Sequence, residues 1–99
     1  MHTGITDLPA PVDTTIRNVT IRGMRTSMRL ENEYWDALDE ASEKLGTTWG
    51  ELLNRICTAA QQHHPDLSYS RAVRVWAVRW FRDQVADAER RARRRAAAQ

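Results

Sequence analysis

The chain has 99 residues, of which 41% are hydrophobic, so it forms one small globular domain and wholesale disorder is excluded. A single cysteine excludes an internal disulfide, and no apolar run reaches the roughly 18 residues of a membrane span. Because the N-terminus also lacks the pattern of a signal peptide, these features predict a cytoplasmic protein without a membrane contact.

The net charge of +2 is unevenly distributed. Residues 17–29 carry four arginines and no acidic residue, whereas residues 30–51 carry seven acidic residues and one lysine. Residues 71–99 carry nine arginines and three acidic residues. Arginine supplies all but one of the basic residues, which codon bias explains at least as well as selection for bidentate contacts.

The N-terminal part of the chain divides into an arm and a strand. Residues 1–16 include Pro9 and Pro11 and show little periodicity, so they are expected to form a flexible arm. Residues 17–22 alternate polar and apolar side chains, which predicts a strand.

The phase of this alternation changes at Gly23. Val19 and Ile21 are the apolar residues before the glycine, and Met28 and Leu30 follow it in the opposite phase. A continuous strand would place the two sets on opposite faces, so a bulge or a turn is predicted at Gly23.

Residues 32–45 predict the first helix. Acidic residues gather near its start, where the helix dipole favours negative charge, and Gly46 is expected to end it. Its apolar stripe consists of Tyr34, Trp35, Leu38, Ala41 and Leu45.

The second helix is expected to begin at a capping box formed by Thr48 and Glu51. It should end near Gln62, because Pro65 disfavours helical backbone at the preceding residue. Its inward residues are expected to be Leu52, Leu53, Ile56, Cys57 and Ala60.

A third helix is predicted from Tyr69, after a cap at Ser68, to beyond Val85. Two apolar stripes predict burial on two sides, and another subunit is the expected second cover. The stripes are Val73, Trp76, Ala77 and Trp80, and Val75, Val78 and Val85. The arginine-rich end has helix propensity without an apolar stripe, which indicates a frayed helix or a solvated tail.

The order strand, acidic helix, glycine turn and capped helix resembles a ribbon-helix-helix domain, a fold that reads the major groove with strands. The stretches VTIRGMRTSMRLENEYWDAL and LSYSRAVRVWAV are similar to a bacterial subfamily with a G-x-R-T-S-x-x-L-E strand motif. The similarity covers residues 17–82, and Met24 stands where many members have histidine.

The resemblance implies a mainly α fold with one short β-ribbon, in an intertwined homodimer with an additional C-terminal helix. Strands from two chains would pair, and their shared core would comprise Met28, Leu30, Trp35, Leu38, Leu52, Leu53 and Ile56. The expected parts are an arm over 1–16, the ribbon-helix-helix core over 17–65, a third helix over 66–88 and an arginine-rich tail over 89–99.

The same resemblance assigns Arg25, Ser27 and Arg29 to contacts with DNA bases. The structural alternative for these arginines is a solvated strand face that blocks aggregation. The residues expected to contact phosphates are Thr48, Trp49, Arg22, Arg93, Arg94 and Arg95. For Thr48 and Trp49 the alternative is plain capping, and for the tail arginines it is a solvated helix end.

The sequence offers little for other chemistry. Cys57, His63 and His64 match no zinc spacing, so neither a metal nor another cofactor is expected. No nucleophile or phosphate-binding motif is present, so we do not expect an enzyme. Most of the tryptophans lie on core stripes, which favours packing over base stacking.

The predicted function is therefore sequence-specific binding of double-stranded DNA by a dimeric bacterial repressor or autoregulator associated with the nucleoid. Higher-order assembly of dimers on DNA and a protein partner for the third helix are both compatible with this prediction. The alternative is a protein-interaction module, such as an antitoxin or an adaptor. Operator, regulated genes and effector do not follow from the sequence.

Overall fold

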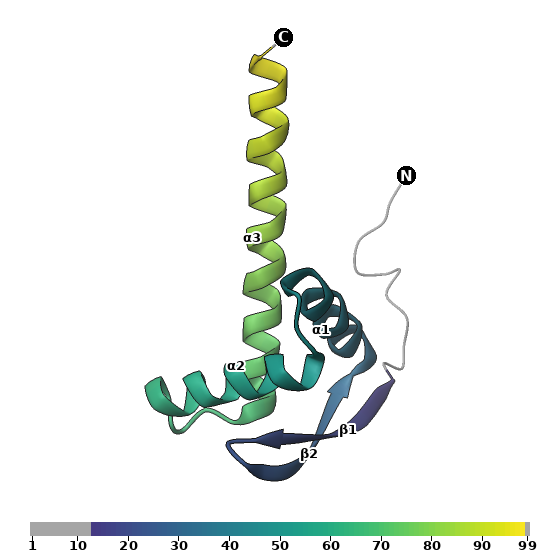
Figure 1. Ribbon diagram of the computed structural model, residues 1–99, viewed down its shortest axis with the longest axis vertical. Coiled ribbons are helices and arrows are strands. Elements are labelled where there is room, and N and C mark those ends of the chain that lie inside the picture. Colours follow the sequence, from purple (N-terminus) through teal and green to yellow (C-terminus); the bar gives the residue numbers. More distant parts are fainter. Residues whose placement is uncertain (1–12, 99) are drawn as a thin grey trace.

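The computed structural model describes residues 13–98. Two strands come first and three helices follow (Figure 1). In chain order they are β1 (Thr14–Ile21), β2 (Met24–Glu31), α1 (Asn32–Leu45), α2 (Trp49–His63) and α3 (Tyr69–Ala97).

The long helix α3 sets the shape of the molecule. Its first half packs beside α1 and α2, while its C-terminal half extends away from them (Figure 1). The strands lie at the opposite end of the molecule from the C-terminus (Figure 1). Most of the predicted arm, residues 1–12, lies outside the described residues.

The strands β1 and β2 form an antiparallel hairpin within one chain. Its two-residue loop has positive φ at both Arg22 (52°) and Gly23 (81°), the backbone signature of a turn that matches the twist of the strands. The turn predicted at Gly23 is thus confirmed. The expected boundaries of the arm were wrong, because β1 already begins at Thr14.

The hairpin also changes the expected pairing of the ribbon. The resemblance implies strands from two chains, whereas here β2 pairs with β1 of its own chain. The turn returns the chain so that the apolar residues of both strands face the helices, namely Val19, Ile21, Met28 and Leu30. The phase change in the sequence is therefore the reversal of a hairpin.

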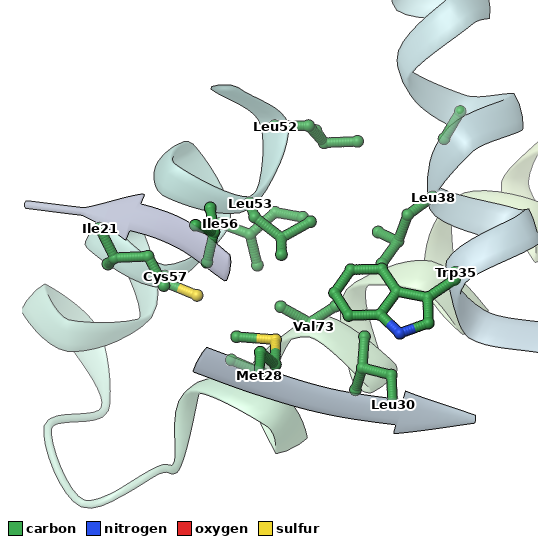
Figure 2. Close-up of a cluster of buried hydrophobic side chains, with 13 residues drawn as sticks. Ile21, Met28, Leu30, Trp35, Leu38, Leu52, Leu53, Ile56, Cys57 and Val73 are labelled. Atoms are coloured by element: carbon green, nitrogen blue, oxygen red, sulfur yellow. The ribbon is translucent and has the colours of Figure 1, made fainter. Parts of the chain in front are cut away.

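A single hydrophobic core lies between the hairpin and the helices (Figure 2). Figure 2 shows side chains from β1, β2, α1, α2 and α3 converging on it. Leu30, Leu38, Leu53 and Val73 are fully buried without any second chain. All seven residues assigned to a dimer core lie in this core, and its sharing between two chains stays a prediction.

Arg17 fastens β1 to the first two helices. Its guanidinium donates two hydrogen bonds to the Asp39 carboxylate, at 2.8 and 3.0 Å. The same group lies 4.6 Å from the ring centroid of Trp35 and 4.9 Å from that of Trp49. Trp35 Nε1 in turn donates to the Thr15 carbonyl at 2.8 Å. The hydrogen bond to Asp39 raises the pKa of Arg17, because it favours the charged form of the guanidinium.

The helix ends follow the sequence. Gly46 adopts left-handed backbone after α1, and the Thr48 hydroxyl accepts from the Glu51 N–H at 3.1 Å. Only this half of the capping box forms among the described residues, because the Glu51 carboxylate pairs with Arg55. Ser68 caps α3 as predicted.

The helix α3 is longer than expected. It runs to Ala97 and includes most of the predicted tail, since alanine and arginine are strong helix formers. Ion pairs from Asp87 to Arg90 and Arg91 support the exposed part. Near its start, Arg74 pairs with Glu31 at 2.9 Å, which ties α3 to the end of β2.

The thiol of Cys57 gives a simple test of this core. Burial raises the pKa of Cys57 to about 11, so almost no thiolate exists at pH 8. We expect a thiol reagent to label the folded protein far more slowly than the protein in urea. Equal labelling rates would contradict the burial of this side chain.

Replacing Arg17 tests the fastening of β1. We expect Arg17→Met to lower the free energy of unfolding by about 1–3 kcal/mol, because it removes two cation–π contacts and a partly exposed ion pair. The matched control is Arg55→Met, which breaks an exposed pair within α2 and should cost less than about 0.5 kcal/mol. Urea denaturation measures both, and equal small losses would refute the anchoring role.

Candidate nucleic-acid interface

The candidate surface is the face of the hairpin that points away from the helices. Four residue pairs occupy it, and they are Thr14 with Glu31, Ile16 with Arg29, Asn18 with Ser27, and Thr20 with Arg25. All of these side chains are exposed except that of Glu31, which is half-buried. The alternation of a strand thus separates a buried face from a polar face.

Hydrogen bonding of the ribbon brings these outward side chains close together. Asn32 N–H donates to the Asp13 carbonyl at 2.9 Å, which makes that pair a hydrogen-bonded one. Hydrogen-bonded and non-hydrogen-bonded pairs alternate along an antiparallel ribbon, so the four outward pairs are non-hydrogen-bonded. In such pairs the two Cα atoms lie closer together. The hydrogen bond from Ser27 Oγ to Asn18 Oδ1, at 2.8 Å, agrees with this geometry.

The structure brings together the three residues predicted to contact bases. Arg25, Ser27 and Arg29 are all exposed on the outward face of β2. Between residues 13 and 98, Arg25 makes no hydrogen bond or ion pair. Arg29 donates a single exposed bond to Thr14 Oγ1 at 3.1 Å. Both guanidinium groups are therefore available to an external acceptor.

The start of α2 adjoins this face. A shallow pocket of about 350 Å³ is lined by Thr20 and Arg25 of the hairpin and by Trp49 and Gly50 of α2. This pocket places the first turn of α2, with its backbone N–H groups, beside the ribbon, and Thr48 is exposed there. The Trp49 indole packs against the Arg17 guanidinium, so only the backbone of Trp49 is suited to a phosphate.

The remaining predicted phosphate contacts divide into two groups. Arg22 lies at the exposed tip of the hairpin, where its backbone N–H donates to Asn54 Oδ1 at 2.8 Å. Arg93, Arg94 and Arg95 lie near the end of α3, at the far end of the molecule from the hairpin (Figure 1). One chain therefore does not bring the tail arginines to the ribbon face.

The outward residues of β1, above all Asn18, were not predicted as site residues from the sequence. The signal was present, because a two-residue turn ending in glycine fixes the register of both strands. Once Val19 and Ile21 face the core, Asn18 and Thr20 must face outward beside Ser27 and Arg25.

The tryptophans pack within or against the core, and the titratable groups of residues 13–98 form no metal site. Trp35 is buried, and Trp49, Trp76 and Trp80 pack partly buried against the core. No group of three histidine, cysteine or acidic residues in the described chain is placed to hold a metal. The helices described are too short or too polar to cross a membrane.

The chain matches the family described as "Ribbon-helix-helix domain" over residues 14–81, which is more than half of its length. The chain belongs to the ribbon-helix-helix domain family. The match begins at the first residue of β1 and ends within α3, so the hairpin is part of the domain. Domains of this family typically bind DNA or act in toxin–antitoxin systems.

The ribbon-helix-helix domain is also similar to a solved structure, that of an uncharacterized protein from Bordetella pertussis Tohama I. The two are 28% identical, with a TM-score of 0.66, over 81% of this chain and 62% of that one. This chain thus spans less than two thirds of that protein's length. No protein among the curated sequences matches the chain.

Proposed function

We propose that this ribbon-helix-helix domain binds double-stranded DNA sequence-specifically, as a transcriptional repressor or autoregulator in the bacterial cytoplasm. The observation that carries the proposal is the exposure of Arg25, Ser27 and Arg29 on one face of a two-stranded ribbon. The major groove of B-DNA is wide enough to admit such a ribbon.

The chemistry of these side chains suits base edges. A guanidinium can donate two hydrogen bonds to O6 and N7 of guanine, whereas a serine hydroxyl discriminates poorly between bases. Arg25 loses no contact with the described protein on binding, and Arg29 exchanges one exposed hydrogen bond. The cost of freeing the two arginines is therefore small.

Backbone amides and charge support the same orientation on DNA. The N–H groups after Thr48, at the positive end of the α2 dipole, suit a phosphate beside the groove. Arg22 adds a cation at the hairpin tip. Acidic residues are concentrated in α1, which packs on the core side of the hairpin, whereas the outward face of the ribbon carries Arg25 and Arg29 and so suits a polyanion.

We also propose that two chains act together on DNA, as is usual in this family. Because β2 already pairs with β1, we infer that a second chain covers the apolar face of α3. Val75, Val78 and Val85 are 41, 47 and 59% exposed there, which is unfavourable for an isolated chain.

A protein-interaction module is the second candidate function, and the same exposed face of α3 favours it. A toxin or another protein could cover Val78 and Val85 in place of a second copy. Such an adaptor would show little affinity for mixed genomic DNA at low salt, whereas a regulator would bind it measurably.

Substitution of the ribbon arginines tests the proposed function. We expect Arg25→Ala and Arg29→Ala each to cost about 1–3 kcal/mol of binding on a site selected from random duplexes. Binding to a scrambled duplex should fall only modestly, because phosphate contacts remain. Isotherms on both duplexes at several salt concentrations provide the measurement.

Replacing Arg93, Arg94 and Arg95 together provides the control for loss of charge. If the tail touches DNA, this variant should lose affinity equally on both duplexes and show a shallower salt dependence. If the ribbon variants behaved in that way, the ribbon would contact phosphates alone. If they bound DNA as the unaltered protein does, the DNA-binding face would lie elsewhere and the adaptor would be favoured.

A further inference from the structure

We propose that β1 reads DNA bases together with β2, so that each ribbon recognises an asymmetric sequence, with Asn18 as a specificity-determining residue. This inference rests on the proposed function and extends it. A ribbon built from two copies of β2 would present the same residues twice, whereas this ribbon presents two different strands.

The register places β1 residues level with the arginines of β2. Ile16, Asn18 and Thr20 stand opposite Arg29, Ser27 and Arg25, in that order, and all six are exposed. A major groove that receives one strand of this narrow ribbon also receives the other, because neighbouring strands lie only about 5 Å apart. The β1 side chains therefore meet base edges at the same depth as the arginines.

Asn18 has the chemistry of an adenine-reading residue. An asparagine amide donates to N7 of adenine through its nitrogen and accepts from N6 through its oxygen. Asn18 Oδ1 accepts from Ser27 Oγ at 2.8 Å and keeps a second lone pair. Its amide nitrogen has no hydrogen-bond partner between residues 13 and 98. Ser27 thus holds the amide in place without consuming its capacity to recognise a base.

The neighbours of Asn18 extend this preference along β1. Ile16 is 51% exposed on the outward face, where a branched apolar side chain gains nothing from water. Ile16 and the methyl group of Thr20 both suit the C5-methyl group of thymine. The β1 half of the surface therefore suits A·T pairs, while the arginines of β2 suit guanine.

The test compares the DNA sites that the unaltered protein and its variants select from random duplexes. Asn18→Ala should weaken binding to the selected duplex about 10-fold and lose the preference at one A·T pair, while guanine preferences persist. Its affinity for a scrambled duplex should stay within about twofold. Met24→Ala is the matched control, since Met24 is 71% exposed at a β2 position on the opposite face. This variant should select the same DNA site as the unaltered protein.

Two further variants separate reading from folding. Ser27→Ala removes the hydrogen bond to Asn18 but leaves the amide, so the A·T preference should weaken without disappearing. Asn18→Asp keeps the shape of the side chain and removes its donor, so it should lose the adenine preference even if the alanine variant were poorly folded.

Each outcome decides between the claims. If Asn18→Ala and Asn18→Asp select the same site as the full chain while Arg25→Ala loses specific binding, the inference is wrong and the proposed function stands. Equal weakening of both duplexes by Asn18→Ala would also overturn the inference, since it indicates a phosphate contact. If neither Asn18 nor the arginines affect binding, the inference is wrong, the DNA-binding face lies elsewhere, and the proposed function loses the observation that carries it.

Discussion

The contact of Arg17 with Asp39, Trp35 and Trp49 holds β1 against the helices of its own chain. This guanidinium joins β1 to α1 and to the start of α2, and the bond from Trp35 to the Thr15 carbonyl fixes the same strand a second time. A planar cation that lies over two adjoining indoles, with a bidentate carboxylate partner, is a geometry that lysine does not reproduce. The first strand is therefore held against its own helices, and the two-residue turn at Arg22 and Gly23 pairs it with the second strand of the same chain.

The rest of the molecule follows from this pairing within one chain. The hairpin lays four apolar strand residues on the helices, and α3 adds Val73 and Ala77, so the core closes in one chain. The opposite face is left with Arg25, Asn18 and their neighbours, free of any role in the core. The contact of Arg17 with Trp49 also positions the start of α2, whose backbone amides border the outward face of the hairpin. One anchoring side chain thus supports both the fold and the candidate DNA surface.

Much of this could be predicted from the sequence because it depends on local signals. The bounds of α1, the caps at Thr48 and Ser68, and the outward direction of Arg25 and Arg29 follow from periodicity and capping. The strand partner was predicted wrongly, because the resemblance implied strands from two chains although the turn predicted at Gly23 is compatible with a hairpin. The anchoring role of Arg17 depends on three residues distant in sequence, and α3 extends to Ala97 through helix propensity instead of an apolar stripe.

The central claim, that the intrachain hairpin is the form that binds DNA, can be tested by locking it with a disulfide. Thr14 and Glu31 are opposite each other as a non-hydrogen-bonded pair, so Thr14→Cys with Glu31→Cys should form an intramolecular bond, while Cys57 stays buried. Both the oxidised and the reduced form of this variant lack the ion pair between Glu31 and Arg74, so a difference in their DNA affinity does not come from its loss. We predict that both forms bind the selected duplex with affinities within about twofold. Loss of binding on oxidation, restored by reduction, would show that DNA recognition requires the strands to exchange between chains.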